Sequence, residues 1–131
     1  SSGEEKFEIY INSLIDFSKQ ASQKEIKIIL IGSTMRNNLL KLSNKEWFRP
    51  FPPEYVFKEE KKNALELNNR FRNRLENIDN IKFFDPIEEL LCCKNIDEFE
   101  VFFRKGDSNH LSDYGSEVLI KKLIPLISSN Y

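Results

Sequence analysis

The sequence predicts an α/β fold, and more specifically a three-layer α/β/α sandwich built around a parallel sheet. Helical and strand patterns alternate along the 131 residues in the order helix, strand, helix, strand, helix. This alternation is typical of βαβ units, whose right-handed crossovers cover both faces of a parallel sheet. The length suits one hydrophobic core that buries roughly two thirds of the unfolded surface. We therefore expect residues 1–131 to form a single domain, in which Ser1–Gly3 has the composition of a cloning remnant.

The first half of the chain predicts a helix, a strand and a long loop. Residues 5–23 place apolar side chains at helical spacing, which indicates an amphipathic helix. Residues 26–31 are a nearly continuous β-branched run, which favours a strand covered on both faces. Residues 33–57 show neither period and contain three prolines among dispersed aromatic side chains, so we expect a loop. Those aromatic side chains either anchor the loop to the core or line an acyl or sugar site.

The second half predicts a helix, a strand and a short helix before an aromatic segment. Residues 58–77 return to helical spacing, and their charged side chains form a solvated face. Residues 81–84 are the next strand, and Pro86 opens a short helix that runs to Leu91. We expect residues 99–103 to form a short extended stretch.

The last helix begins after Ser112, a residue type suited to the N-cap, and Asp113 carries the charge that a helix N-terminus favours. We expect Pro125 to kink or end this helix. Its apolar face consists of Val118, Leu119, Leu123, Leu126 and Ile127. The only histidine of the chain, His110, therefore lies just before the final helix.

The composition argues against several classes of partner and site. The 20 basic and 21 acidic residues are well mixed, with a net charge of -1, so no basic stripe is available for nucleic acid. The longest apolar run, Ile28–Ile31, falls far short of the roughly twenty residues that span a bilayer, and we expect the chain by itself to be soluble. Cys92 and Cys93 are adjacent and offer no tetrahedral zinc site with a single histidine. We expect both to pack as small hydrophobic side chains, and we expect no metal or cofactor.

Asp107 and His110 are the strongest candidates for catalytic residues. Imidazole is the side chain that ordinarily gains and loses a proton near neutral pH, which suits a general base. A carboxylate three residues upstream can fold back onto the imidazole N–H and hold its tautomer. His110 is then the base and Asp107 its orienting partner, near the carboxyl ends of the strands where open sheets bind ligands. The alternative is an ordinary surface histidine and a turn aspartate beside Gly106.

Residues 81–115 resemble the last block of the SGNH (GDSL-type) hydrolases. More narrowly, they are similar to the SGNH domain fused to membrane acyltransferases of family three, which O-acylate cell-surface polysaccharides. In that group a strand ending in Asp-Pro, a Leu-Cys pair, an aromatic segment and Asp-x-x-His-Leu-Ser follow one another. Here these features are Asp85-Pro86, Leu91-Cys92, residues 99–103 and residues 107–112. The organisation is similar over residues 5–127.

The resemblance implies an SGNH-hydrolase-like, flavodoxin-like sandwich, of which this chain is an incomplete C-terminal portion. It implies serine-based transfer of an acyl group, such as acetyl, from an acyl donor to a glycan acceptor, with Asp107 and His110 as catalytic residues and no cofactor. The parent would be a bacterial membrane protein, with this domain outside the cytoplasm and the membrane domain of the same polypeptide as its partner. A homodimer would be one way to cover the sheet edge that a missing N-terminal half leaves open.

The chain departs from that family in its nucleophile. The family's Gly-Asp-Ser block follows the first buried strand, and no such block lies there, nor can the oxyanion-hole glycine and asparagine blocks be assigned. Gly106-Asp107-Ser108 overlaps the Asp-x-x-His block, which leaves Ser108 two residues from its base. Ser33 follows a buried run but directly succeeds Gly32, without the acidic residue between them. We therefore expect a serine outside this chain. The alternatives are a stand-alone esterase or deacetylase that uses Ser33 or Ser108, and a non-catalytic glycan-binding or interaction module.

Overall fold

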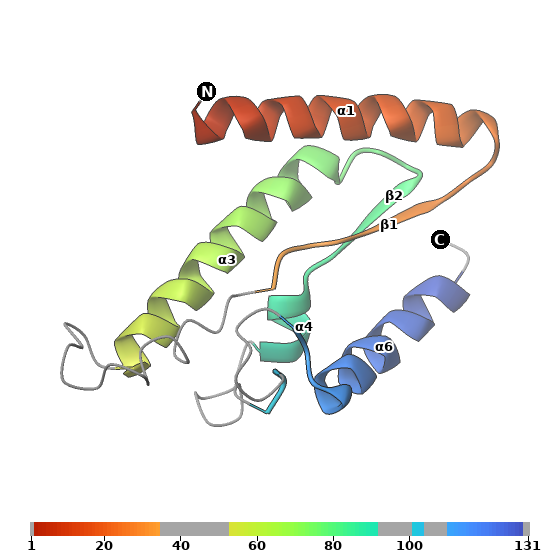
Figure 1. The fold of residues 1–131 in the computed structure, drawn as a ribbon. Coiled ribbons are helices and arrows are strands. Elements are labelled where there is room, and N and C mark those ends of the chain that lie inside the picture. The colour runs from red at the N-terminus through yellow and green to blue at the C-terminus, as the bar shows by residue number, and fades with distance from the viewer. Residues whose placement is uncertain (1, 35–52, 92–100, 104–109, 130–131) are drawn as a thin grey trace.

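The computed structural model describes residues 2–34, 53–91, 101–103 and 110–129 (Figure 1). These residues form a mostly helical α/β fold with two parallel strands, which confirms the predicted class at this level. In chain order the elements are helix α1 (Gly3–Gln23), strand β1 (Ile28–Ile31), helix α3 (Pro53–Leu75), strand β2 (Ile81–Phe84), helix α4 (Pro86–Leu91) and helix α6 (Asp113–Ser128).

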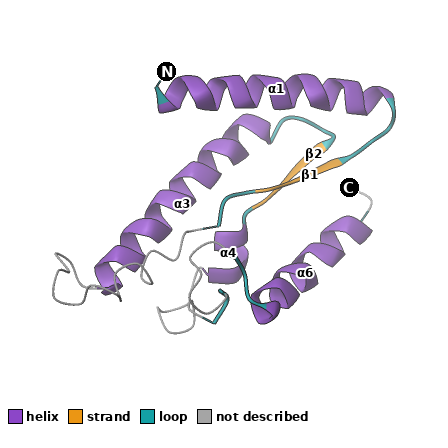
Figure 2. Ribbon diagram, viewed as in Figure 1, coloured by secondary structure: helices purple, strands orange, loops and turns teal. Residues whose placement is uncertain are grey.

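The two strands pair in parallel over four residues each. Ile28 lies opposite Ile81 and Ile31 lies opposite Phe84, and three of the four residues in each strand are of the β-branched or aromatic types that sheets favour. In the view of Figure 2 the strands run between α1 on one side and α6 on the other. Because the strands are parallel, their carboxyl ends lie at the same edge of the sheet, and this edge positions the candidate site.

One hydrophobic cluster packs α1 against the sheet and the C-terminal end of α3. Half-buried Ile28 and Leu30 of β1 pack against it, so one face of the sheet is covered by α1. The helix begins at Gly3 because the hydroxyl of Ser2 accepts the N–H of Glu5 at 3.2 Å and caps the first turn. The buried members of this cluster are Phe7, Ile11, Leu75 and Ile81.

A second hydrophobic cluster joins α3, α4 and α6 at the carboxyl edge of the sheet. Ile87 of α4 is fully buried in it, and Leu111, Val118 and Leu119 pack against it from the C-terminal segment. A Cβ at Gly115 would overlap the carbonyl oxygen of Phe102, so glycine lets α6 begin in close contact with that residue. The buried members of the second cluster are Phe57, Ala64, Ile87, Phe102 and Phe103.

The structure corrects the bounds of two predicted helices. α3 begins at Pro53, so the prediction of a loop through residue 57 is wrong for residues 53–57. Proline fits the first turn of a helix because that position needs no N–H donor, and burial of Phe57 supports the added turn. α6 does not end at Pro125 but runs to Ser128, where the half-buried Leu126 continues its inner face. The strand over residues 81–84 and the helix over residues 86–91 are confirmed.

The aromatic segment before the last helix is less extended than predicted. Val101 and Phe102 lie in a turn, and Phe103 makes one isolated antiparallel bridge with Leu111. Residues 99 and 100, most of the predicted loop, and Cys92 and Cys93 lie outside the described residues. Within the described ranges, no helix has the length and apolar character needed to cross a membrane.

Candidate functional site

The candidate site lies at the carboxyl edge of the sheet, where both strands deliver polar residues. Ser33 follows β1 by two residues, and Asp85 follows β2 directly. Backbone pairing continues one step beyond β1, because the N–H of Gly32 donates to the carbonyl of Phe84 at 2.8 Å. Open α/β sheets bind ligands at this edge, so these two residues lie where a ligand would bind.

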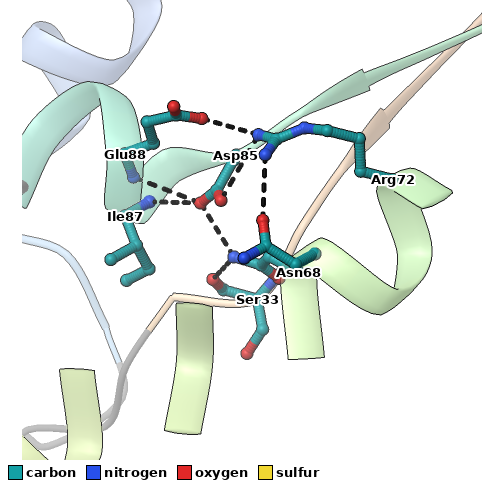
Figure 3. A network of polar contacts seen from close by, with 7 residues as sticks. Ser33, Asn68, Arg72, Asp85, Ile87 and Glu88 are labelled. Carbon is teal, nitrogen blue, oxygen red and sulfur yellow. Dashed lines mark hydrogen bonds and ion pairs between the residues drawn. The ribbon is translucent and has the colours of Figure 1, made fainter. Parts of the chain in front are cut away.

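Asn68 of α3 connects the two strand ends (Figure 3). Its Oδ1 accepts the backbone N–H of Ser33 at 2.9 Å, and its Nδ2 donates to the backbone carbonyl of Ser33 at 2.9 Å. The same Nδ2 donates to Oδ1 of Asp85, also at 2.9 Å. Asn68 is fully buried, and a buried polar group must be hydrogen-bonded. These three hydrogen bonds meet that requirement.

Asp85 caps α4 and is itself buried. Its Oδ1 accepts the backbone N–H groups of Ile87 at 2.9 Å and Glu88 at 3.2 Å, as an N-cap aspartate does. Pro86 then occupies the first helical position, which needs no N–H donor. The local sequence Asp-Pro-Ile-Glu therefore specifies where β2 ends and α4 begins.

Arg72 supplies the positive charge next to Asp85. Its guanidinium lies 3.5 Å from Oδ2 of Asp85, the carboxylate oxygen that accepts no hydrogen bond from the described residues, and 2.6 Å from Oε2 of Glu88. It also donates to Oδ1 of Asn69 at 3.0 Å. Arg72 thus balances a carboxylate that is almost completely buried, while its own side chain remains about one third exposed.

His110 is exposed and lies one residue before the bridge between Leu111 and Phe103. The following turn is fixed by Ser112, whose hydroxyl accepts the N–H of Gly115 at 3.0 Å and donates to the carbonyl of Val101 at 2.7 Å. Ser112 is therefore the N-cap of α6, as predicted. Because Leu111 packs against the cluster that contains Ile87, the His110 segment is joined to the element that Asp85 caps.

The other predicted site residues are Asp107, Ser108 and Ser33, of which the structure describes Ser33 alone. Asp107 and Ser108 lie outside the described residues, so the pairing of Asp107 with His110 stays a prediction. Ser33 is exposed, its hydroxyl donates to the carbonyl of Thr34 at 3.0 Å, and its N–H is engaged by Asn68. Since that N–H is used, it does not serve as an oxyanion-hole donor in this arrangement.

The carboxylates with a shifted pKa lie away from this edge. A hydrogen bond from Arg74 lowers the pKa of Glu8 on α1, and a hydrogen bond from Lys121 lowers the pKa of Glu117 on α6. Both are exposed surface pairs. Among the described residues, no group of three or more histidine, cysteine, aspartate or glutamate side chains could hold a metal ion.

Reasoning from the sequence missed Asn68 and the role of Asp85 beyond its place in the Asp-Pro pair. A signal for Asn68 was available, because it shares a helical stripe with Ala64, Phe71 and Leu75. A polar residue on an apolar stripe is expected to have a buried partner. For Asp85, the sequence of an aspartate, then proline, then glutamate three residues on is a signal for a helix N-terminus.

Gly32 is required for the contact between the end of β1 and Asn68. A Cβ at this position would lie 2.6 Å from Cζ of Phe83 and 2.8 Å from Oδ1 of Asn68. We expect Gly32→Ala to lower the free energy of unfolding by about 1–3 kcal/mol through overpacking, measured by urea denaturation. Gly3→Ala is the control, because nothing lies within 4 Å of its added Cβ. Equal unfolding midpoints for Gly32→Ala and the wild type would contradict the close approach.

No protein-family model matches the chain, and no curated protein or solved structure matches it at a significant level.

Proposed function

We propose that this chain is the C-terminal part of an SGNH-like domain that transfers an acyl group to an extracytoplasmic glycan. The observation that best supports the proposal is that the His110 segment packs near the carboxyl edge of the sheet. Leu111 packs against the hydrophobic cluster that contains Ile87, and Asp85 lies between the end of β2 at Phe84 and the start of α4 at Pro86. A base at this edge lies where an open α/β sheet binds its substrate.

The proposed chemistry has two acyl-transfer steps. A serine supplied by a part of the polypeptide outside this chain loses its hydroxyl proton to His110 and attacks the acyl carbonyl. The bond to the donor breaks, and its leaving group takes the proton from His110. A sugar hydroxyl then loses its proton to His110 and attacks the acyl-serine, and the serine oxygen leaves with that proton. Asp107 holds the imidazole and stabilises its protonated form.

The proposal also includes the detailed fold, the partners and the location that the family resemblance implies. We propose a three-layer, flavodoxin-like sandwich in which further strands pair beside β1. Ile31 at the end of β1 is 47% exposed, whereas the other three residues of the strand are half-buried, and this exposed apolar side chain supports the extension. The proposed partners are an acyl donor, a glycan acceptor and the membrane domain of the same polypeptide, and the proposed location is outside the cytoplasm. A homodimer would instead cover the lateral edge of the sheet, along β1.

A stand-alone esterase that uses Ser33 is the second candidate. The observation in its favour is that Ser33 lies near the carboxyl end of β1 with an exposed side chain. Its backbone N–H and carbonyl are both hydrogen-bonded to the amide of Asn68. Strand ends of this kind display the nucleophile in α/β hydrolases. This candidate needs no part of the polypeptide outside the chain.

Hydrolysis of p-nitrophenyl acetate separates the two candidates. We expect the longer polypeptide to hydrolyse the ester and His110→Ala to slow it at least about a thousandfold, because loss of the base disables the triad. The isolated chain should show no hydrolysis above buffer. Undiminished hydrolysis by the His110→Ala polypeptide would contradict the proposal. Hydrolysis by the isolated chain that is lost in both Ser33→Ala and His110→Ala would favour the esterase.

A further inference from the structure

We infer that Asn68 is a positioning residue, which fixes the backbone of Ser33 and the His110 segment relative to each other. This inference deepens the proposed function, and any effect of Asn68 on catalysis rests on that function. It starts from the amide of Asn68, which is fully buried and uses its oxygen and nitrogen in three hydrogen bonds. All three lead to the carboxyl edge of the sheet and not to the interior of the core.

The side-chain amide is the only group that can make this set of bonds from position 68. One oxygen must accept the N–H of Ser33, while one nitrogen must donate both to the carbonyl of Ser33 and to the carboxylate of Asp85. A carboxylate has no N–H donor, and alanine has neither a donor nor an acceptor. The paired bonds to one residue hold the backbone of Ser33 in a single orientation, as a neighbouring strand would.

The connection from Asn68 to His110 passes through α4. Asp85, bound by Asn68, accepts the N–H of Ile87, so the same carboxylate fixes the first turn of α4. The side chain of Ile87 is fully buried in the second hydrophobic cluster, against which Leu111 packs. Leu111 is the residue after His110. Each link is a hydrogen bond or a packed side chain, and a packed interior transmits displacement.

Nuclear magnetic resonance of this chain tests the connection without any substrate. The chain has a single histidine, so the imidazole Cε1–H of His110 gives one resonance. In Asn68→Asp we expect that resonance to move, and we expect the amides of Ser33 and Ile87 to exchange at least about tenfold faster relative to that of Ile11. Asn63→Asp on the exposed side of the same helix is the control and should change neither.

A purely structural role of Asn68 predicts a different result. It predicts lower overall stability with an unmoved His110 resonance and unchanged relative exchange at Ser33 and Ile87, and this result would overturn the inference. If Asn68→Asp does not fold, Asn68→Ser gives the same comparison, because its hydroxyl group is small and polar but lacks the second donor and the reach of the amide.

Kinetics of the longer polypeptide test whether Asn68 positions His110 for catalysis. With p-nitrophenyl acetate we expect Asn68→Asp to lower kcat roughly tenfold to a hundredfold with a much smaller change in KM, because a small misplacement of the base slows the reaction more than it weakens binding. Asn63→Asp should keep both values. Retained kcat in Asn68→Asp, when His110→Ala is inactive, would overturn the positioning role and leave the proposed function standing. Retained activity in His110→Ala would instead overturn the proposed function.

Discussion

Asp107→Asn in the proposed longer polypeptide is expected to lower the rate of the proposed acyl transfer by about four orders of magnitude. In a serine triad the aspartate keeps the imidazole in the tautomer that can accept the serine proton, and asparagine stabilises the wrong tautomer while preserving the shape. Because the substitution changes one atom of the side chain, substrate binding should be nearly unchanged. The measurement is kcat for p-nitrophenyl acetate hydrolysis under saturating ester, beside the wild type.

The matched control for this prediction is Asp113→Asn. Asp113 carries the same side chain six residues later, in the first turn of α6, and is exposed. Its substitution removes a favourable charge at a helix N-terminus, which affects stability by about 0.3–1 kcal/mol and leaves the chemistry intact. Equal rates for Asp107→Asn and Asp113→Asn would contradict the assignment of Asp107 as the partner of His110.

Ile87→Ala is expected to produce the largest loss of stability at the candidate site. The side chain of Ile87 is fully buried among Phe57, Phe102 and Phe103, so its removal leaves a cavity between α3, α4 and the segment that leads into α6. Loss of buried methyl and methylene groups of this kind lowers the free energy of unfolding by about 2–5 kcal/mol. Urea denaturation followed by circular dichroism measures the change.

Ile120→Ala on α6 removes the same side chain from an exposed position and serves as the control. Ile120 is 53% exposed, so its substitution should change the free energy of unfolding by no more than about 0.5 kcal/mol. If Ile87→Ala destabilises the chain no more than Ile120→Ala does, then α4 does not join the carboxyl edge of the sheet to the His110 segment.

The elements that could be predicted from the sequence are those defined by local signals. β2 is a short run that contains one β-branched and two aromatic residues, and the Asp-Pro pair after it both ends the strand and begins α4. Ser112 likewise marks the start of α6 through its own hydroxyl. These boundaries depend on capping and on backbone restriction by proline, which act over three or four residues.

Predictions failed where packing over longer distances decides the structure. Proline-rich sequence before residue 57 indicated a loop, but burial of Phe57 on the same face as Ala64 extends α3 back to Pro53. Of the two effects expected of Pro125, a kink or an end of the last helix, the end is wrong, because α6 continues to Ser128 with Leu126 half-buried. In both cases the helix extends beyond the bound that the prolines indicated, with apolar side chains of the added residues on its inner face.

The candidate site could be predicted only in part. The Asp-x-x-His spacing draws attention to His110, because one histidine and one carboxylate are sufficient to suggest a base and its partner. The role of Asn68 depends on Ser33, which lies 35 residues away in the sequence. No local pattern specifies that pairing, because it is created when α3 packs beside the strand ends. A polar residue on an apolar helical stripe indicates only that some buried partner exists.

The measurement that tests the central claim most directly is the O-acyl content of the surface glycan, released by mild base from cells that carry His110→Ala. The comparison strain carries Lys122→Ala, which changes an exposed residue of α6. If His110 is the base for acyl transfer, the His110→Ala cells contain no more acyl groups than cells without the protein, and Lys122→Ala cells match the wild type. Wild-type acyl content in the His110→Ala cells would contradict the claim.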